Sequence, residues 1–155
     1  MTQVAERSKP VGAREEQQVS ALVFHLGREL RTALDRRLTS HGLTSQQAAL
    51  ILLSRLLHEP NPNKMAERLG TDTAGMTRLI DRLEKKGLIF RKTSPEDRRS
   101  IVIVLGPKSK HMLPRLIPEF RHVEDSVLDG FSKHEVGQLS SMLRRLLKNA
   151  RNLNR

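Results

Sequence analysis

The sequence predicts a mainly α-helical protein with a small β-wing, a winged helix-turn-helix flanked by long N- and C-terminal helices. Three observations lead to this fold class. Two short helical patterns meet at a glycine, as in a helix-turn-helix. Two strand-like segments around a polar turn follow at once, as in a β-hairpin. Long amphipathic helical patterns stand before and after this unit.

The N-terminal part is expected to contain a tail and then two helices. Residues 1–13 are mostly polar, so we expect a disordered tail. Apolar side chains recur at helical spacing over residues 14–40, and Gly42 breaks that pattern. Thr44 and Gln47 form a capping-box pair for the next helix. Because the interior of that helix is apolar all round, we expect it to be buried in the middle of the domain.

The helix-turn-helix is predicted between Asn61 and Gly87. Asn61 is expected to cap the first helix, and Gly70 to supply the turn, because glycine adopts positive φ without a steric penalty. Asp72 is a good cap for a second helix over residues 73–86. A helix in this second place lies in the major groove of DNA and reads bases with its N-terminal residues.

A hairpin is predicted directly after the second helix. Residues 88–93 and 100–105 are rich in β-branched and apolar side chains, which favours strands. The polar turn between them carries Asp97, Arg98 and Arg99. A hairpin in this place is a wing, and exposed arginines on a wing suit a narrow minor groove.

The last third of the sequence predicts two more helices, ending near residue 152. Pro114 and Pro118 fall inside the first of them. An interior proline removes a hydrogen bond and clashes with the carbonyl four residues earlier. Either this helix begins after Pro114, or it is kinked there.

The motifs together resemble one family. The run from Asp72 to Ile89, the triplet Asp97-Arg98-Arg99 and the strand from Ile101 to Leu105 are similar to the MarR family, the multiple-antibiotic-resistance regulators of bacteria and archaea. The resemblance implies a single MarR-like domain over residues 14–155. Its winged helix-turn-helix lobe is expected at about residues 44–106, and its dimerisation helices at about residues 14–40 and 107–152.

The resemblance implies a cytoplasmic, sequence-specific regulator of transcription that binds double-stranded DNA. We expect a homodimeric repressor on a pseudo-palindromic operator, released by a small aromatic or anionic effector. A two-fold dimer presents two recognition helices about one DNA turn apart. Two alternatives remain open, a constitutive DNA-binding regulator without a ligand and a winged-helix module for protein interaction.

Candidate DNA contacts lie on the second helix and on the wing. Arg78 is the best candidate for a base contact, because a guanidinium group can grip guanine O6 and N7 together. Arg82 is expected at a phosphate. The alternative is a solvated face on which these arginines pair with Asp81 and Glu84. The full candidate set is Thr73, Ala74, Thr77, Arg78, Arg82, Arg98 and Arg99.

Two acidic residues are expected to support the site. The resemblance assigns Asp72 and Asp97 to the structure of the recognition helix and wing, and it suggests an ion pair between Asp72 and Arg99. Arg99 is then a clamp for the wing, a contact to the minor groove, or both. Arg98 is the freer probe of the minor groove or a phosphate. Gly106 departs from the family, in which many members have Thr at that place, and the two prolines leave the lobe spacing open.

Composition excludes several other classes. The net charge of +11 favours polyanions such as DNA. The sequence has no cysteine, and none of its six histidines stands at metal-binding spacing, so we expect no metal and no cofactor. No catalytic arrangement stands out, so we expect no enzyme. No signal pattern or membrane-spanning run is present. The sequence does not indicate the ligand-binding residues, operator sequence, effector or target genes.

Overall fold

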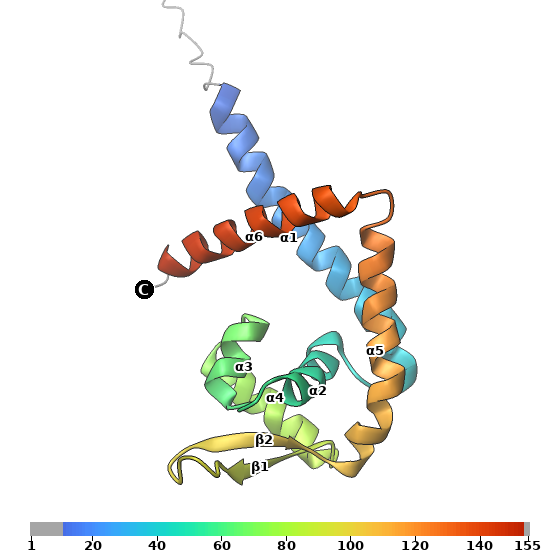
Figure 1. Ribbon diagram of the computed structural model, residues 1–155, viewed down its shortest axis with the longest axis vertical. Coiled ribbons are helices and arrows are strands. Elements are labelled where there is room, and N and C mark those ends of the chain that lie inside the picture. The colour runs from blue at the N-terminus through green and yellow to red at the C-terminus, as the bar shows by residue number, and fades with distance from the viewer. Residues whose placement is uncertain (1–10, 154–155) are drawn as a thin grey trace, which may run out of the picture. The chain divides into compact units, whose positions relative to one another are not determined.

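The structure, a computed structural model, describes residues 11–153, with the side chains from residue 18 on. It is mostly helical and carries a two-stranded sheet, which confirms the predicted fold class (Figure 1). The elements in chain order are α1 (Val11–Leu38), the short 3-10 helix η1 (Thr39–His41), α2 (Ser45–Leu56), α3 (Pro62–Leu69), α4 (Thr73–Lys85), β1 (Ile89–Thr93), β2 (Ile101–Leu105), α5 (Pro107–Val127) and α6 (Lys133–Leu153).

The start of α1 differs from the prediction. Residues 11–13 were expected in a tail but belong to this helix, while the rest of the predicted tail, residues 1–10, lies outside the described residues. The helical pattern continues backwards through Ala13, a strong helix former, and helix ends vary by a residue or two.

The chain divides into two compact units, one up to Glu119 and one from Phe120 on. The first contains the helix-turn-helix, the wing, α1 and the larger part of α5. The second contains the end of α5 and all of α6. In the described residues, no helix is both long and apolar enough to cross a membrane.

The helix-turn-helix forms through local caps. The Asn61 Oδ1 atom accepts a hydrogen bond from the Lys64 amide at 2.9 Å, and the helix α3 then ends at Gly70 with a φ of 61°. The Asp72 Oδ1 atom accepts from the Gly75 amide at 2.6 Å and so caps α4. These contacts confirm the predicted caps and turn. They satisfy amides that have no partner inside a helix.

The core of the first unit lies between the helices and the wing. On α2, Leu50 and Ile51 are buried, whereas Leu52 and Leu53 are only half-buried, so α2 is less enclosed than predicted. The other fully buried large apolar side chains are Leu38, Met65, Met76, Ile80, Leu83, Ile89, Ile103 and Leu116. This core fixes the inner face of α4 and so determines which face remains outside.

The wing is an antiparallel pair whose register runs from Ile89 opposite Leu105 to Thr93 opposite Ile101. Its far end closes through the Ser94 amide, which donates to the Ser100 carbonyl at 2.8 Å. The Ile103 amide donates to the Pro60 carbonyl at 2.9 Å, so the connection before α3 covers part of the outer edge of β2. The wing is therefore tied to the helix-turn-helix through the backbone.

Helix α5 runs through both prolines, so the alternative that it begins after Pro114 is wrong. Pro114 and Pro118 are exposed, while Leu113 and Leu116 are buried. The carbonyls that lose an amide partner lie on the exposed side of α5, where water can reach them. Burial of Leu113 and Leu116 on the other side stabilises the helix.

Candidate DNA interface

One face of α4 is exposed and carries the predicted DNA contacts. Met76, Ile80 and Leu83 are buried and point this helix into the core. The exposed residues are Thr73, Ala74, Thr77, Arg78 and Arg82. The Thr77 hydroxyl donates to the Thr73 carbonyl at 2.9 Å, as hydroxyls on helices often do. This bond engages the Thr77 hydroxyl within the helix.

Within the part of the chain that the structure describes, the arginines on this face have no acidic partner. Among the described residues, the side chains of Arg78 and Arg82 make no ion pair or hydrogen bond. The alternative that Asp81 and Glu84 neutralise them is wrong, because both carboxylates pair with Arg91 of β1 instead. The guanidinium groups of α4 are thus available to an external anion.

Arg91 is a site residue that the sequence analysis missed. Its Nη2 atom lies 2.6 Å from the Asp81 Oδ1 atom, and its Nη1 atom contacts the Glu84 carboxylate. Its backbone amide donates to the Glu84 Oε1 atom at 3.1 Å. The hydrogen bond to Asp81, followed by the charges of both carboxylates, raises the pKa of Arg91 above its usual value. The sequence gives only a weak signal for this cluster, a basic residue in a strand soon after a helix that carries Asp81 and Glu84 in its second half.

The tip of the wing is shaped by two side chains. The Asp97 Oδ1 atom accepts from the Arg99 amide at 2.9 Å, and the buried Ser94 hydroxyl accepts from the amides of Glu96 and Asp97 at 3.2 and 3.4 Å. Such bonds fix a tight turn. They place Arg98 on an exposed tip beside Arg99, and both guanidinium groups lack a partner within the part of the chain that the structure covers.

The expected ion pair between Asp72 and Arg99 is not formed in the described structure. The Asp72 carboxylate caps α4 instead, and the Arg99 contact to Asp97 uses its backbone amide. A cap bond to the positive end of a helix is a strong local use for a carboxylate. The wing is held to α4 through Arg91 rather than through Arg99.

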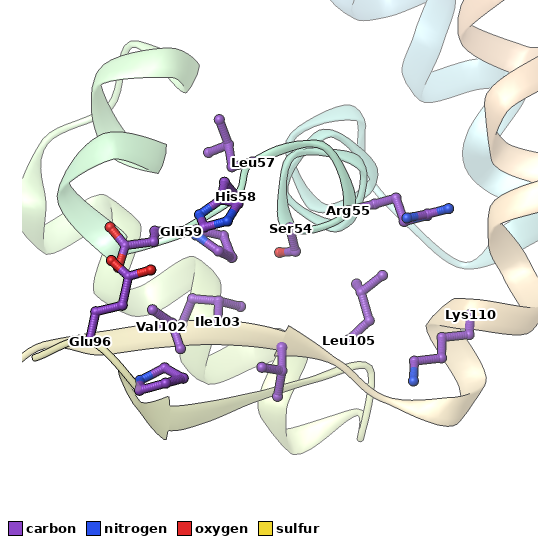
Figure 2. Close-up of a pocket in the computed structure, with 13 residues that line it drawn as sticks. Ser54, Arg55, Leu57, His58, Glu59, Glu96, Val102, Ile103, Leu105 and Lys110 are labelled. Carbon is purple, nitrogen blue, oxygen red and sulfur yellow. The ribbon is translucent and has the colours of Figure 1, made fainter. Parts of the chain in front are cut away.

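A cavity of about 440 Å³ lies behind the wing, between the end of α2, the connection to α3, β2 and the start of α5 (Figure 2). Its middle is apolar, with Val102, Ile103 and Leu105. Glu59 and Glu96 face each other at one end, and Lys110 stands at the other (Figure 2). The hydrogen bond from Lys64 at 3.3 Å, followed by the one shared with Glu96, lowers the pKa of Glu59.

Within residues 11–153, no group of three or more His, Asp or Glu side chains is placed to hold a metal ion.

The fold and its exposed arginines define a winged helix-turn-helix with a cationic face, the class of protein that docks on DNA.

Comparison with known proteins agrees with this class. The sequence model of the MarR family matches residues 43–101. The chain is 28% identical over 131 residues to the transcriptional repressor MprA of Escherichia coli K12, covering 83% of this chain and 74% of MprA. It is 34% identical to transcriptional regulator PA3341, whose crystal structure superposes with a TM-score of 0.76 over 86% of this chain and 98% of that one. The chain belongs to the MarR family of DNA-binding transcriptional regulators.

A second similar structure is that of a MarR mutant from Escherichia coli complexed with operator DNA, with a TM-score of 0.74. It covers 86% of this chain and 96% of the other, and at 20% identity it supports the shared fold alone.

Proposed function

We propose that this protein is a homodimeric, sequence-specific repressor that binds a pseudo-palindromic operator and is released by a small molecule. The observation that carries the DNA-binding part is a set of four exposed arginines that have no partner among the described residues, Arg78 and Arg82 on α4 and Arg98 and Arg99 on the wing. A helix and a hairpin that present guanidinium groups in this order suit a major groove and the minor groove beside it. The similarity to the repressor MprA supports the direction of regulation.

Each candidate residue has a role in this proposal. Arg78, near the start of α4, reads a guanine edge, and Arg82, one turn later, binds a phosphate. Thr73 and Ala74 contact the backbone or a thymine methyl group, and Thr77 offers its methyl because its hydroxyl is engaged. Arg98 and Arg99 enter the minor groove or bind phosphates. Asp72 and Asp97 hold the helix start and the wing tip.

The experiment for base reading is binding of Arg78→Ala to operators that differ at single base pairs. We expect loss of discrimination at one base pair in each half-site, about 1–3 kcal/mol. Arg115→Ala removes an equal charge from the exposed side of α5 and is the control. An unchanged preference profile for Arg78→Ala would contradict the proposed base contact.

The homodimer is supported by apolar faces that the single chain leaves exposed. On α6, no described residue is buried, and Met142, Leu146 and Leu147 are 56%, 45% and 53% exposed. On α1, Val19, Leu22 and Val23 share one side of the helix and are 46%, 68% and 44% exposed. Stripes of this size on long helices are typical of association surfaces. A second copy is the occupant that also supplies the second half-site contact.

The dimer is tested by sedimentation of Leu146→Glu and Leu147→Glu, which place charges on the apolar side of α6. We expect monomers or aggregates that have lost binding to the full operator. Ser141→Glu, at an exposed position of the same helix, adds the same charge and is the control. A soluble monomer of either leucine variant that binds the full operator with unchanged affinity would overturn the homodimer.

Release by a small molecule is supported by the cavity behind the wing. Its volume of about 440 Å³ falls in the range of small-molecule sites, roughly 300–1,000 Å³. A ligand that prefers one wing position would shift the population of DNA-competent molecules. The test is a screen of small aromatic carboxylates for operator release. If none releases the operator, the constitutive regulator is favoured, and binding of duplex DNA without salt dependence would favour the protein-interaction module.

A further inference from the structure

Arg91 holds two carboxylates that belong to the recognition helix. It lies on β1, and its side chain is 31% exposed. Asp81 and Glu84 lie on α4 with side chains 47% and 33% exposed. Three hydrogen bonds connect them, two from the guanidinium group and one from the Arg91 backbone amide. A single residue therefore fixes both acidic side chains of the second half of α4.

The position of Asp81 gives this pairing a consequence for DNA binding. Asp81 stands three residues after Arg78, and side chains three or four residues apart are neighbours on a helix surface. A free Asp81 carboxylate is thus a competing partner for the Arg78 guanidinium. Without Arg91 to balance them, Asp81 and Glu84 would also place negative charge on the helix that approaches the DNA phosphates, and the two would repel each other.

We propose that Arg91 is a positioning residue for sequence recognition, because it holds Asp81 away from Arg78 and leaves that guanidinium free for a base. This inference rests on the proposed base contact of Arg78. It assigns to a wing strand a part in specificity that does not require Arg91 itself to touch DNA.

A purely structural role for Arg91 predicts a different result. If the ion pairs only tie β1 to α4, their loss weakens the fold and no second change on α4 restores recognition. If Arg91 acts through Asp81, removing the Asp81 charge in the same molecule restores recognition although the ion pairs are gone. The two roles are separated by a double variant.

The experiment compares the full-length protein with Arg91→Gln, Asp81→Asn and the double variant. The readout is a ratio of two affinities, that for the operator divided by that for an altered operator. The altered operator is changed at the base pair at which Arg78→Ala loses discrimination. We expect Arg91→Gln to lower this ratio about tenfold, in the range of one lost base contact. We expect the double variant to recover most of it. Lys92→Gln, an exposed neighbour on β1, removes an equal charge and is the control.

Each outcome decides a separate point. If Arg78→Ala leaves the ratio unchanged, the proposed base contact fails. If Arg78→Ala lowers the ratio but Arg91→Gln does not, only the positioning role fails. If the double variant stays as low as Arg91→Gln, the role of Arg91 is structural and the inference is overturned. Should Arg91→Gln not fold, Arg91→Lys keeps the charge without the two-pronged geometry, and the same rescue by Asp81→Asn is required.

Discussion

The backbone at Gly106 lies so close to Gly87 that a Cβ atom on Gly106 would stand 2.5 Å from the Gly87 carbonyl oxygen. Gly87 ends the recognition-helix region with a φ of 68°, and Gly106 ends the wing. The Gly106 amide donates to the Leu88 carbonyl at 2.9 Å, and the buried Ser109 hydroxyl donates to the same carbonyl. The two glycines therefore form the junction of α4, the wing and α5.

This contact predicts that Gly106→Ala destabilises the protein. The added methyl group meets backbone, which cannot rotate away as a side chain can, so we expect a loss of about 1–3 kcal/mol in the free energy of unfolding. Gly106→Thr should cost at least as much, although many family members carry Thr at this place. Gly137→Ala is the control, since a Cβ there meets nothing within 4 Å, and we expect it to stabilise α6 by roughly 0.5–1 kcal/mol. Equal urea midpoints for Gly106→Ala and the wild type would contradict the close approach.

A pH-dependent contribution to stability is predicted at Glu119 of α5. Its Oε2 atom accepts from the Arg37 Nε atom at 2.6 Å, and this bond, with a smaller effect of His41, lowers the pKa of Glu119. A carboxyl whose pKa is lowered by folding stabilises the fold at any pH above its pKa in the unfolded chain. It loses that contribution as the pH falls through its pKa in the folded protein. Arg37→Gln should therefore have a smaller free energy of unfolding than the wild type at pH 7. The difference in free energy between the two proteins should shrink below about pH 4.

Urea unfolding between pH 7 and pH 3 measures this effect. Arg36→Gln, on an exposed neighbour, is the control, and its difference from the wild type should not change in the same way. A difference for Arg37→Gln that stays constant over the whole range would remove the role of Glu119.

Arg98 is predicted to contribute affinity without sequence preference. Because its side chain is exposed and unpaired at the wing tip, Arg98→Ala should weaken binding to operator and random duplex by similar factors. The slope of log affinity against log salt should flatten by about 0.9 for one lost phosphate contact. Titrations at several salt concentrations test this, with Arg115→Ala as the control. An unchanged slope would mean that Arg98 does not displace counterions.

The sequence predicts the local features of this fold well, because their causes lie within a few residues. The turn at Gly70 depends on that residue's own positive φ. The caps at Asn61 and Asp72 each join a side chain to an amide three residues away. The capping box at Thr44 and Gln47 forms for the same reason. Alternating apolar residues likewise locate both wing strands to within one residue.

Contacts between segments are predicted less well. Asp72 has a cap to make as well as a possible ion pair, and only the fold decides which it forms. Arg91 meets Asp81 and Glu84 because β1 turns back beside α4, which no spacing in the sequence reveals. The sequence therefore locates the exposed arginines but not what keeps them unpaired.

The last prediction concerns the two prolines inside α5. Local propensity disfavours both prolines inside a helix, but burial of Leu113 and Leu116 on the opposite side outweighs the lost hydrogen bonds. Pro118 also stands one residue before the boundary between the two compact units at Glu119. The segment of α5 that lacks backbone hydrogen bonds thus lies just before the boundary between the two units.

Replacing both prolines with Ala adds two amide donors, one for the Lys110 carbonyl and one for the carbonyl of residue 114. We expect the thermal midpoint to rise, although the gain is reduced because Ala also frees the unfolded chain. If the geometry of α5 at the prolines determines how the recognition helices meet the operator, affinity at the natural half-site spacing should fall in the same variant. His111→Ala, at an exposed position of α5, is the control for helix propensity alone. Binding to operators with half-sites moved by one base pair completes the test, because a changed α5 should alter the preferred spacing. A higher midpoint with unchanged affinity and spacing preference would show that the prolines limit the stability of α5 and have no part in operator fit.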